Sequence, residues 1–427
     1  MAPEGASPCG PNRPVSAVKV IVLILVLVVI AVGYEWTAID RLIYALVIFL
    51  IVAFVWSQLS LRSLVVMRSL ASDRAQVGQT IHEEITLRNR GWLPKLWIEV
   101  RDYSTLPGHE LSRVVRLGPR GSVTWQRTTV CWQRGQFRLG PLALHSGDPF
   151  GIFTLRRTVP ATHDLLVYPP VFNLSAFPLP MAALYGGVVQ TRPLAVATPS
   201  VGGLRAYVAG DPLNRISWSA TARTGSMMVK ELDPDPSADV WIVLDLEADA
   251  RWKAQSGPST RNNAIRWLDS TEEYGVAIAA SLAQRSLDDG REVGLIINRS
   301  QPMRILPDHN ERQWLRIFEL LSVATAQGTR PLAITLSQEA KRFNRQSAVV
   351  VVTASPLSEW VEAMGSLRDR RIPVIAVVLD ASSFDESAPG SDAVVQALHA
   401  RRVPVMTVRF GDDPAAALAT RGANSGS

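Results

Sequence analysis

The feature that most limits how this chain of 427 residues can fold is a pair of long apolar segments near its start. Residues 20–33 read VIVLILVLVVIAVG, and residues 42–61 form a second run without a charge. A helix needs roughly 20 apolar residues to cross the hydrocarbon of a bilayer. We therefore predict a transmembrane hairpin over residues 17–61, with spans at 17–36 and 42–61, preceded by a cytoplasmic tail at 1–16.

The charges beside this hairpin set its expected orientation. A cleaved signal peptide is the alternative for the first run, but a second apolar run follows closely and no small-x-small cleavage site lies between them. Basic residues flank the two apolar runs: Arg13 and Lys19 precede residues 20–33, and Arg62, Arg68 and Arg74 follow residues 42–61. Because Lys and Arg are retained on the cytoplasmic side, we expect a protein of the cytoplasmic membrane whose two ends both face the cytoplasm.

Composition argues against several kinds of site. The two cysteines, Cys9 and Cys131, form neither a disulfide framework nor a zinc motif, and the six histidines are scattered. The net charge of +6 comes from residues 61–238, because residues 239–427 are slightly acidic. A basic segment beside an anionic leaflet is typical of attraction to the membrane surface. Since the arginines are dispersed and no DNA- or RNA-binding motif accompanies them, we expect no nucleic-acid partner.

Residues 62–185 show the alternation of half-buried strands. Apolar Ile81, Ile85 and Leu87 fall on one parity and polar residues on the other, and turn signals recur about every ten residues. Strands are expected at 79–89, from 97 onward, at 123–132 and at 136–144. This pattern predicts an all-β, immunoglobulin-like sandwich without the cysteine pair of antibody domains.

One stretch of this region resembles a known family. Residues 134–153 read RGQFRLGPLALHSGDPFGIF, and residues 167–169 read VYP. They are similar to the β-domain signature of the bacterial membrane proteins that contain domain of unknown function 58. In physical terms the glycines permit tight turns, and Phe150 and Phe153 are expected to fill one face of the sandwich. No catalytic pair stands out, so we interpret the stretch as structural.

A more specific signature lies within residues 186–238, which otherwise read as a linker rich in Pro, Gly and Ala. It resembles the hallmark of the same family: an arginine and a tyrosine, a Gly-Asp turn, an Arg-Ile-x-Trp pair, an Ala-Arg pair and a strand ending in Lys-Glu. The matching residues are Arg205, Tyr207, Gly210, Asp211, Arg215, Ile216, Trp218, Ala222, Arg223, Lys230 and Glu231.

The same residues have a physical interpretation. Asp211 is expected to cap a short helix over residues 212–222, with Ile216 and Trp218 anchoring it to a core. The charged side chains are expected to form a fixed polar network through two-point arginine–carboxylate pairs. Because no Ser, Cys or His is placed as a nucleophile, we interpret the signature as structural or partner-binding, with anion binding by the arginines as the alternative.

Residues 239–413 change to an alternation of strands and helices. Residues 240–244 form an unbroken apolar run, typical of a buried parallel strand, and Ser270 and Glu273 form a capping box at a helix start. The expected helices are 271–287, 311–326, 359–370 and 394–401, and the further strands are 293–297, 347–353, 373–379 and 405–408. This alternation predicts a doubly wound α/β domain, followed by a flexible tail at 414–427.

Three acidic residues, Asp245, Glu247 and Asp249, follow the first strand of this domain, at the edge where doubly wound sheets bind ligands. The order of elements and this acidic tip resemble a von Willebrand factor A domain, which the family carries at this place. The resemblance implies a divalent ion at a D-x-S-x-S tip, but only Asp245 fits that motif and no aspartate follows Thr353. We therefore expect a degenerate site without a cofactor, and Mg²⁺ held by the three carboxylates is the alternative.

The resemblance covers nearly the whole chain and implies a function. Members of the family are associated with MoxR-type AAA+ ATPases and with transglutaminase-like membrane proteins. A membrane-anchored adaptor is implied, which presents its A-like domain to such an ATPase during the assembly or maturation of other proteins. Because the chain has no Walker loop, no Gly-x-Ser-x-Gly, no zinc pattern and no cysteine–histidine arrangement, we expect it not to be an enzyme.

Two other functions stay open on the sequence. One is a metal-dependent hydrolase at Asp245, Glu247 and Asp249, which binding of a divalent ion distinguishes. The other is a module that binds the membrane surface or an envelope polysaccharide through the basic β-domain. Loss of liposome binding after Arg-to-Glu exchange in that domain distinguishes this one.

Overall fold

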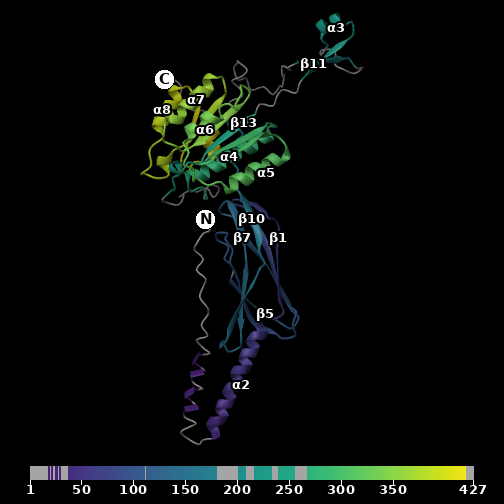
Figure 1. Cartoon of the computed structure of the whole chain (residues 1–427), viewed down its shortest axis with the longest axis vertical. Coiled ribbons are helices and arrows are strands. Elements are labelled where there is room, and N and C mark those ends of the chain that lie inside the picture. The colour runs from purple at the N-terminus through teal and green to yellow at the C-terminus, as the bar shows by residue number, and fades with distance from the viewer. Residues whose placement is uncertain are drawn as a thin grey trace. The chain divides into compact units, whose positions relative to one another are not determined.

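The computed structural model describes residues 37–110, 112–179, 201–207, 216–232, 239–254 and 267–419, and parts of 18–29. The chain divides into two compact units, Met1–Tyr168 and Pro169–Ser427 (Figure 1).

Helix α2 (Thr37–Ser60) is long and apolar enough to cross a membrane, with a mean hydropathy of 2.4 over its candidate span Ala38–Ser60. It contains most of the second predicted span and begins earlier than expected, because residues 37–41 continue the helix. The first predicted span lies largely outside the described residues. Among the described residues there is therefore one candidate membrane helix, and the two-span hairpin stays a prediction.

The strands after α2 build a β-sandwich region. The first sheet has the order β1 (Leu64–Leu70), β3 (Thr80–Asn89), β6 (Ser122–Val130), and the second the order β5 (Ser112–Leu117), β4 (Lys95–Asp102), β8 (Leu142–Gly147), β9 (Thr154–Val159). A third small sheet is formed by β2 (Arg74–Gln76), β10 (His163–Tyr168) and β7 (Gly135–Leu139). The first two sheets share one apolar core, whose members include Ile85, Leu87, Ile98, Val100, Leu117, Trp125, Leu142 and Leu144. The structure therefore confirms the prediction of a β-rich domain in this part of the chain.

Two details of the predicted β-domain differ from the structure. The single strand expected at 136–144 is two strands, β7 and β8, separated at Gly140 and Pro141. Gly140 has a φ of 86°, and a Cβ there would collide with the Ala161 carbonyl oxygen, so the ladder cannot continue through this point. Pro141 also lacks the amide proton that a ladder needs.

The boundary between the two units lies after Tyr168 rather than at residue 185. Residues beyond it pack on α4 (Thr271–Asp288) of the second unit: the Phe172 amide donates to Ser281 Oγ at 2.9 Å, and Arg285 donates to the Phe177 carbonyl at 2.9 Å. These hydrogen bonds and the burial of Phe177 fix the segment to the α/β unit.

Part of the predicted linker is folded. Strands β11 (Val201–Ala206) and β12 (Met228–Leu232) pair in antiparallel fashion, and the short helix α3 (Trp218–Thr224) lies between them in the sequence. Ile216 forms a bridge with Val229 and is buried. The signature residues therefore belong in part to a small β-α-β piece.

The second unit contains a sheet of mainly parallel strands in the order β15 (Met303–Asp308), β14 (Val293–Asn298), β13 (Val240–Asp245), β16 (Ala348–Thr353), β17 (Val374–Leu379), β18 (Val405–Val408). Only β15 is antiparallel to its neighbour. Its helices are α4, α5 (Glu311–Val323), α6 (Leu332–Glu339), α7 (Glu359–Asp369), α8 (Asp392–Ala400) and α9 (Pro414–Ala419). An α/β sheet domain was predicted and is present.

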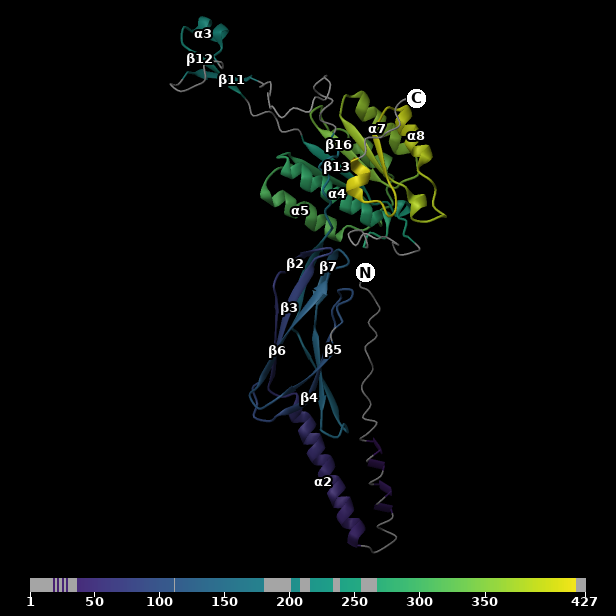
Figure 2. The ribbon, with the colours of Figure 1, turned by 180° about the vertical axis from the view of Figure 1, so that it is seen from behind.

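Helices cover both faces of this sheet (Figures 1 and 2). Trp241 and Val243 of β13 share a core cluster with residues of α6, α7 and α8. On the opposite face, Gly275 of α4 lies so close that a Cβ there would stand 3.2 Å from Leu244 Cδ1. Alternate residues of the buried strands thus face the two helical layers, which is why the sequence of β13 is apolar throughout.

The capping box and most predicted elements of this unit are present. Ser270 accepts the Glu273 amide at 3.3 Å and begins α4. Strand β15 and helix α6 were not predicted, α5 ends at Val323 rather than at residue 326, and residues 414–419 form α9 where a flexible tail was expected. Helix α9 buries Leu418, and that burial is the reason these residues are ordered.

Candidate functional sites

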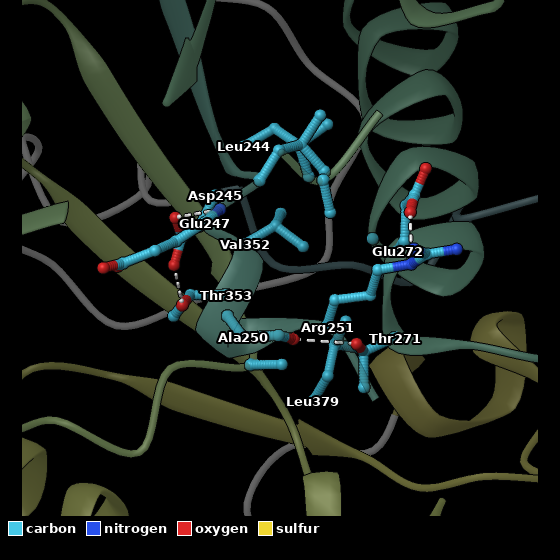
Figure 3. A pocket seen from close by; sticks show the side chains of 14 residues that line it. Leu244, Asp245, Glu247, Ala250, Arg251, Thr271, Glu272, Val352, Thr353 and Leu379 are labelled. Carbon is cyan, nitrogen blue, oxygen red and sulfur yellow. Dashed lines mark hydrogen bonds and ion pairs between the residues drawn. The ribbon is translucent and has the colours of Figure 1, made fainter. Parts of the chain in front are cut away.

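The order of the strands in the sheet identifies one edge as the expected place for a ligand. Strands β13 and β16 are neighbours, and the chain moves from β13 to β14 on one side and to β16 on the other. Ligands in open α/β sheets bind outside the carboxyl ends of the strands at such a switch point. Asp245 and Thr353 are the last residues of these two strands, and they line a small cavity there (Figure 3).

Asp245 is almost fully buried and hydrogen-bonded through both carboxylate oxygens. Its Oδ1 accepts from Asn298 Nδ2 at 2.8 Å and from the Glu247 amide at 3.2 Å, and its Oδ2 accepts from Thr353 Oγ1 at 2.7 Å. Burial raises the pKa of Asp245, although these hydrogen bonds oppose the shift. The carboxylate joins β13, β14 and β16 at the point where they end.

The network continues away from the cavity through buried side chains. Thr335 of α6 donates to Asn298 Oδ1 at 2.7 Å, and Asn298 Nδ2 also donates to the Arg330 carbonyl at 3.0 Å. Thr353 Oγ1 accepts the Ser355 amide at 2.9 Å. Because each donor and acceptor has a protein partner, this polar cluster acts as a rigid link between strands and loops.

Glu247 lies next to this cluster and has little solvent exposure. Burial, with the charges of Asp245 and Asp249, raises the pKa of Glu247 to about 7, and the charge of Glu359 adds to the effect. Asp249 is exposed on a short 3-10 helix, Ala248–Ala250. The loop is fixed to α4 by Thr271, whose hydroxyl donates to the Ala250 carbonyl at 2.8 Å.

The three acidic residues predicted as a degenerate metal site occupy different environments. Among the described residues, one group of three metal-ligand atoms lies within 4.8 Å of one another, and it is Glu83, Asp102 and His109. Asp245, Glu247 and Asp249 therefore do not converge as a compact ligand set. Asp380, at the end of β17, is another buried carboxylate of this edge, and Arg409 Nε pairs with it at 3.2 Å. Sequence reasoning missed Asp380.

The structure describes only part of the family signature. Gly210, Asp211 and Arg215 lie outside the described residues. Arg205 lies in β11, Lys230 and Glu231 lie in β12, and Tyr207 follows β11.

The helix expected at 212–222 begins at Trp218 instead, because Ile216 is in a bridge and Ser217 is not helical. Trp218 does not anchor a core, since 66% of its surface is exposed, and Arg223 is also exposed.

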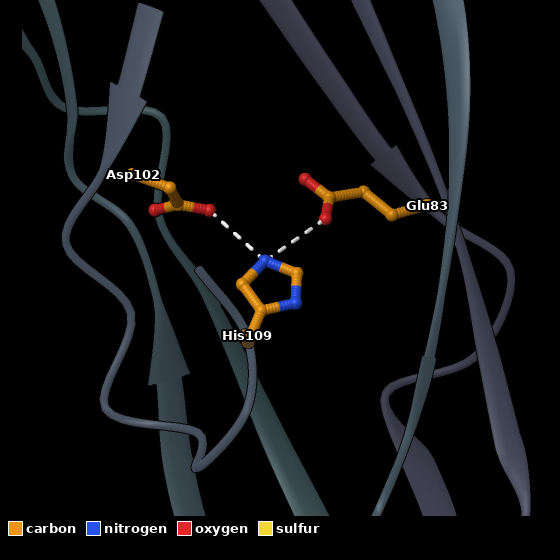
Figure 4. A group of neighbouring side chains, drawn as sticks. All are labelled: Glu83, Asp102 and His109. Atoms are coloured by element: carbon orange, nitrogen blue, oxygen red, sulfur yellow. Dashed lines mark hydrogen bonds and ion pairs between the residues drawn. The ribbon is translucent and has the colours of Figure 1, made fainter. Parts of the chain in front are cut away.

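A second cluster of charged side chains lies inside the β-sandwich. Arg68 of β1 pairs with Glu83 of β3 at 2.5 Å and with Asp102 of β4 at 2.5 Å. His109 Nε2 lies 3.2 Å from Glu83 Oε2 and 3.1 Å from Asp102 Oδ2 (Figure 4). Thr129 Oγ1 lies 2.9 Å from His109 Nδ1. All four ionisable side chains have at most 1% of their surface exposed, and sequence reasoning did not identify the cluster.

The charges in this cluster balance when His109 is protonated. Burial alone lowers the pKa of His109, but its hydrogen bonds to Asp102 and Glu83 and their negative charges outweigh burial, so its pKa is raised. Burial raises the pKa of Glu83 and Asp102, but their bonds to His109 and Arg68 dominate and hold both below their usual values. Two cations and two carboxylates then form a neutral set. Because Arg68 already pairs with both carboxylates, we interpret the cluster as an ion-pair network rather than as a metal site.

We expect this cluster to make the stability of the β-domain depend on pH. The pKa of His109 is raised in the folded state, so its contribution is complete below its unfolded value of about 6.5 and is lost as the pH rises through the folded pKa. Urea unfolding of the full chain in detergent, followed by proteolysis of the β-domain, should show lower stability at about pH 9 than near pH 6. In His109→Gln this difference should largely disappear, and an unchanged pH dependence would contradict the assignment.

Part of the chain matches a known protein family. Residues 203–395 match the model of the family described as protein of unknown function DUF58. This range begins in β11 and ends in α8, so it covers the signature and most of the α/β sheet.

Relatives of the chain include two uncharacterized bacterial proteins. YeaD of Bacillus subtilis is 20% identical over 379 residues, which are 87% of this chain and 89% of that protein. Rv1480 of Mycobacterium tuberculosis is 23% identical over 201 residues, 46% of this chain and 59% of that relative. The chain thus matches nearly the whole of YeaD but less than two thirds of the mycobacterial protein.

Among solved structures, the CARDB domain of the PF1109 protein of Pyrococcus furiosus, a complex with di-metal ions, is similar at 20% identity. It covers 24% of this chain and 86% of that domain, with a TM-score of 0.19. At this score the similarity supports no conclusion about the fold, and the sandwich is defined by its own strands and core.

Proposed function

We propose that this protein is a membrane-anchored, non-enzymatic adaptor that presents a von Willebrand factor A-like α/β domain to a MoxR-type AAA+ ATPase. Helix α2 supplies the anchor, with the first apolar run as a second span and both chain ends in the cytoplasm. The β-sandwich, of immunoglobulin-like type, follows the anchor. The adaptor serves the assembly or maturation of other proteins, with a transglutaminase-like membrane protein as a further partner.

The observation that carries this proposal is the set of hydrogen bonds that the Asp245 carboxylate accepts. A metal-dependent hydrolase needs this carboxylate for an ion, but its oxygens already accept hydrogen bonds from Asn298, Thr353 and the Glu247 amide. A buried carboxylate with three protein donors has little to gain from exchanging them for a cation. This arrangement favours a structural role for Asp245 and a recognition role for the exposed side chains around it.

The exposed side chains are Asp249, Leu357 and Glu359, and together with the buried Glu247 they form what we call the acidic edge. The charges of Asp249 and Glu359 both act on Glu247, and half of the Leu357 surface is exposed. Leu357 lies in the loop after β16, two residues before Glu359. An exposed apolar side chain next to acidic residues is typical of a protein contact with a basic partner surface. The acidic edge is therefore the surface that we propose for the ATPase.

The test is direct binding between purified components. The full chain is reconstituted in nanodiscs, and a MoxR-type ATPase from the same organism is added in its nucleotide-bound form. Binding is expected for the unchanged chain and is expected to fall at least tenfold when Asp249→Arg and Leu357→Glu are combined, since both charge and apolar contacts reverse.

A further inference from the structure

The loop between β8 and β9 has an unusual position in the first unit. Gly147 ends β8 and pairs with Thr154 of β9, so residues 148–153 form the tip of a hairpin. This tip packs on α2 rather than on the sandwich: the rings of Phe150 and Phe49 lie 4.6 Å apart, and those of Phe153 and Phe54 lie 5.6 Å apart. The expectation that Phe150 and Phe153 fill a face of the sandwich is therefore wrong.

The position of these contacts along α2 sets the depth of the tip. An α-helix rises 1.5 Å per residue, so Phe49 lies about 16 Å before the end of α2 at Ser60. Phe49 belongs to the candidate membrane span, and its neighbours Ile51 and Val52 have 57% and 55% of their surfaces exposed. Phe150 itself is 64% exposed, and its ring extends this apolar surface of the helix.

The end of α2 is fixed to the sandwich, so the hairpin and the helix hold one relative position. Lys95 Nζ donates to the Leu59 carbonyl at 2.5 Å, and Arg157 Nη1 donates to the Leu61 carbonyl at 3.2 Å. These bonds satisfy carbonyls that a helix end leaves without partners. Trp92, which is 77% exposed, lies on a loop of the same end, where the Arg90 amide donates to the Ser63 carbonyl. Tryptophan at this level is typical of a membrane boundary.

Several backbone amides of the tip have hydrogen-bond partners within the protein, as an apolar environment requires. Asp148 is fully buried, and its carboxylate accepts the amide of Phe150 at 2.9 Å and the amide of Phe153 at 2.5 Å. The Asp148 carbonyl accepts the Gly151 amide at 3.3 Å, and Pro149 has no amide proton. Irregular backbone within a bilayer requires that its polar groups find partners in the protein. Asp148 accepts hydrogen bonds from three amides of the tip, those of Phe150, Gly151 and Phe153, while the ring of Phe150 is exposed.

We propose that the Asp148–Phe153 tip enters the hydrocarbon of the bilayer beside α2, with Phe150 in contact with lipid acyl chains. This inference rests on the proposed anchoring by α2. It gives the β-domain a second attachment to the membrane that needs no particular headgroup. Because the sandwich is already fixed to α2, the attachment limits tilting of the two together and so fixes the orientation of the sandwich to the membrane surface.

The experiment uses cysteine variants of the full chain in a Cys9→Ser background. Cys131 is fully buried, and burial raises its pKa to about 11, so it stays unlabelled. An environment-sensitive fluorophore is attached in turn at Phe150→Cys, at Val52→Cys as the lipid control and at Ser72→Cys as the water control. Ser72 is exposed and follows β1, at the end of the sandwich away from α2.

Each labelled protein is placed in vesicles of phosphatidylcholine and phosphatidylglycerol that contain a doxyl-labelled lipid. We expect the label at position 150 to lose fluorescence to the doxyl lipid about as strongly as the label at position 52, and several-fold more than the label at position 72. Iodide dissolved in the water should quench the label at position 72 several-fold more strongly than the labels at positions 150 and 52. Pro149→Cys, at the exposed neighbouring position, serves as a second reporter of the tip.

Two results overturn the inference, and they differ. If positions 149 and 150 respond to iodide like position 72 while position 52 responds to the doxyl lipid, the helix is in the membrane but the tip is not. If position 52 also responds to iodide rather than to lipid, the anchoring by α2 fails and the tip inference fails with it.

Discussion

Replacing Arg68 by methionine is expected to destabilise the β-domain by about 3 to 5 kcal/mol, because Glu83 and Asp102 lose a buried partner in the same step. The cluster would then hold two carboxylates and one imidazolium without access to water. Methionine keeps much of the volume of arginine, so lost packing contributes little. Hydrogen exchange of the full chain in detergent micelles, followed in peptides of β3, measures the effect within this unit.

Arg138→Met is the matched control. Arg138 also pairs with an aspartate, Asp164 at 3.1 Å, but both side chains are more than half exposed. Exposed pairs of this kind contribute about 0 to 1 kcal/mol, so exchange in β3 should barely change. Equal effects of the two substitutions would contradict the importance assigned to the buried cluster. Replacing all four cluster residues by apolar ones should restore most of the stability, because no buried charge is then left unpaired.

The second large effect is expected at Asp245. Asp245→Ala removes the acceptor of Asn298, Thr353 and the Glu247 amide, and each buried group left without a partner costs about 1 to 3 kcal/mol. Asp245→Asn keeps an acceptor oxygen at the same place and removes a buried charge, so its effect should be much smaller. Hydrogen exchange in peptides of β13 and β16 measures the destabilisation caused by each of the two substitutions.

This pair of variants also separates the structural role from the hydrolase alternative. If Asp245 serves the fold, Asp245→Asn should leave exchange near that of the unchanged chain, and calorimetry with Mg²⁺, Mn²⁺ or Ca²⁺ should show no difference between them. If the unchanged chain binds a divalent ion and Asp245→Asn abolishes that binding, the carboxylate is a ligand, and the adaptor proposal loses its main support.

Periodicity predicted the parts of the fold that carry a strong local signal. The alternation of Ile81, Ile85 and Leu87 predicted β3, and the capping box at Ser270 predicted the start of α4. Strand β15 and helix α6 were missed because their elements are short and only partly buried, and their order depends on neighbours in the sheet. The separation of β7 from β8 was missed although Gly140 and Pro141 mark it.

The candidate sites were predicted less completely, because side-chain partners come from distant segments. Asp245 follows from the end of an apolar strand, but Asn298 and Thr335 come from another strand and a helix. The ion-pair cluster had one signal in the sequence, since Glu83 falls on the same parity as Ile81 and Ile85, where a charge demands a partner. Its partner Arg68 lies in the first strand, β1, and the spacing of residues in the sequence does not show that Arg68 pairs with Glu83.

The most direct test of the account is the affinity of the nanodisc-bound chain for a purified MoxR-type ATPase of the same organism. Asp369→Arg is the matched control, because it makes the same charge reversal at an exposed position at the end of α7. We predict tight binding by the unchanged chain and by Asp369→Arg, and binding at least tenfold weaker with Asp249→Arg and Leu357→Glu combined. Absence of binding by the unchanged chain, or equal affinity of all three proteins, would contradict the proposed adaptor and its acidic edge.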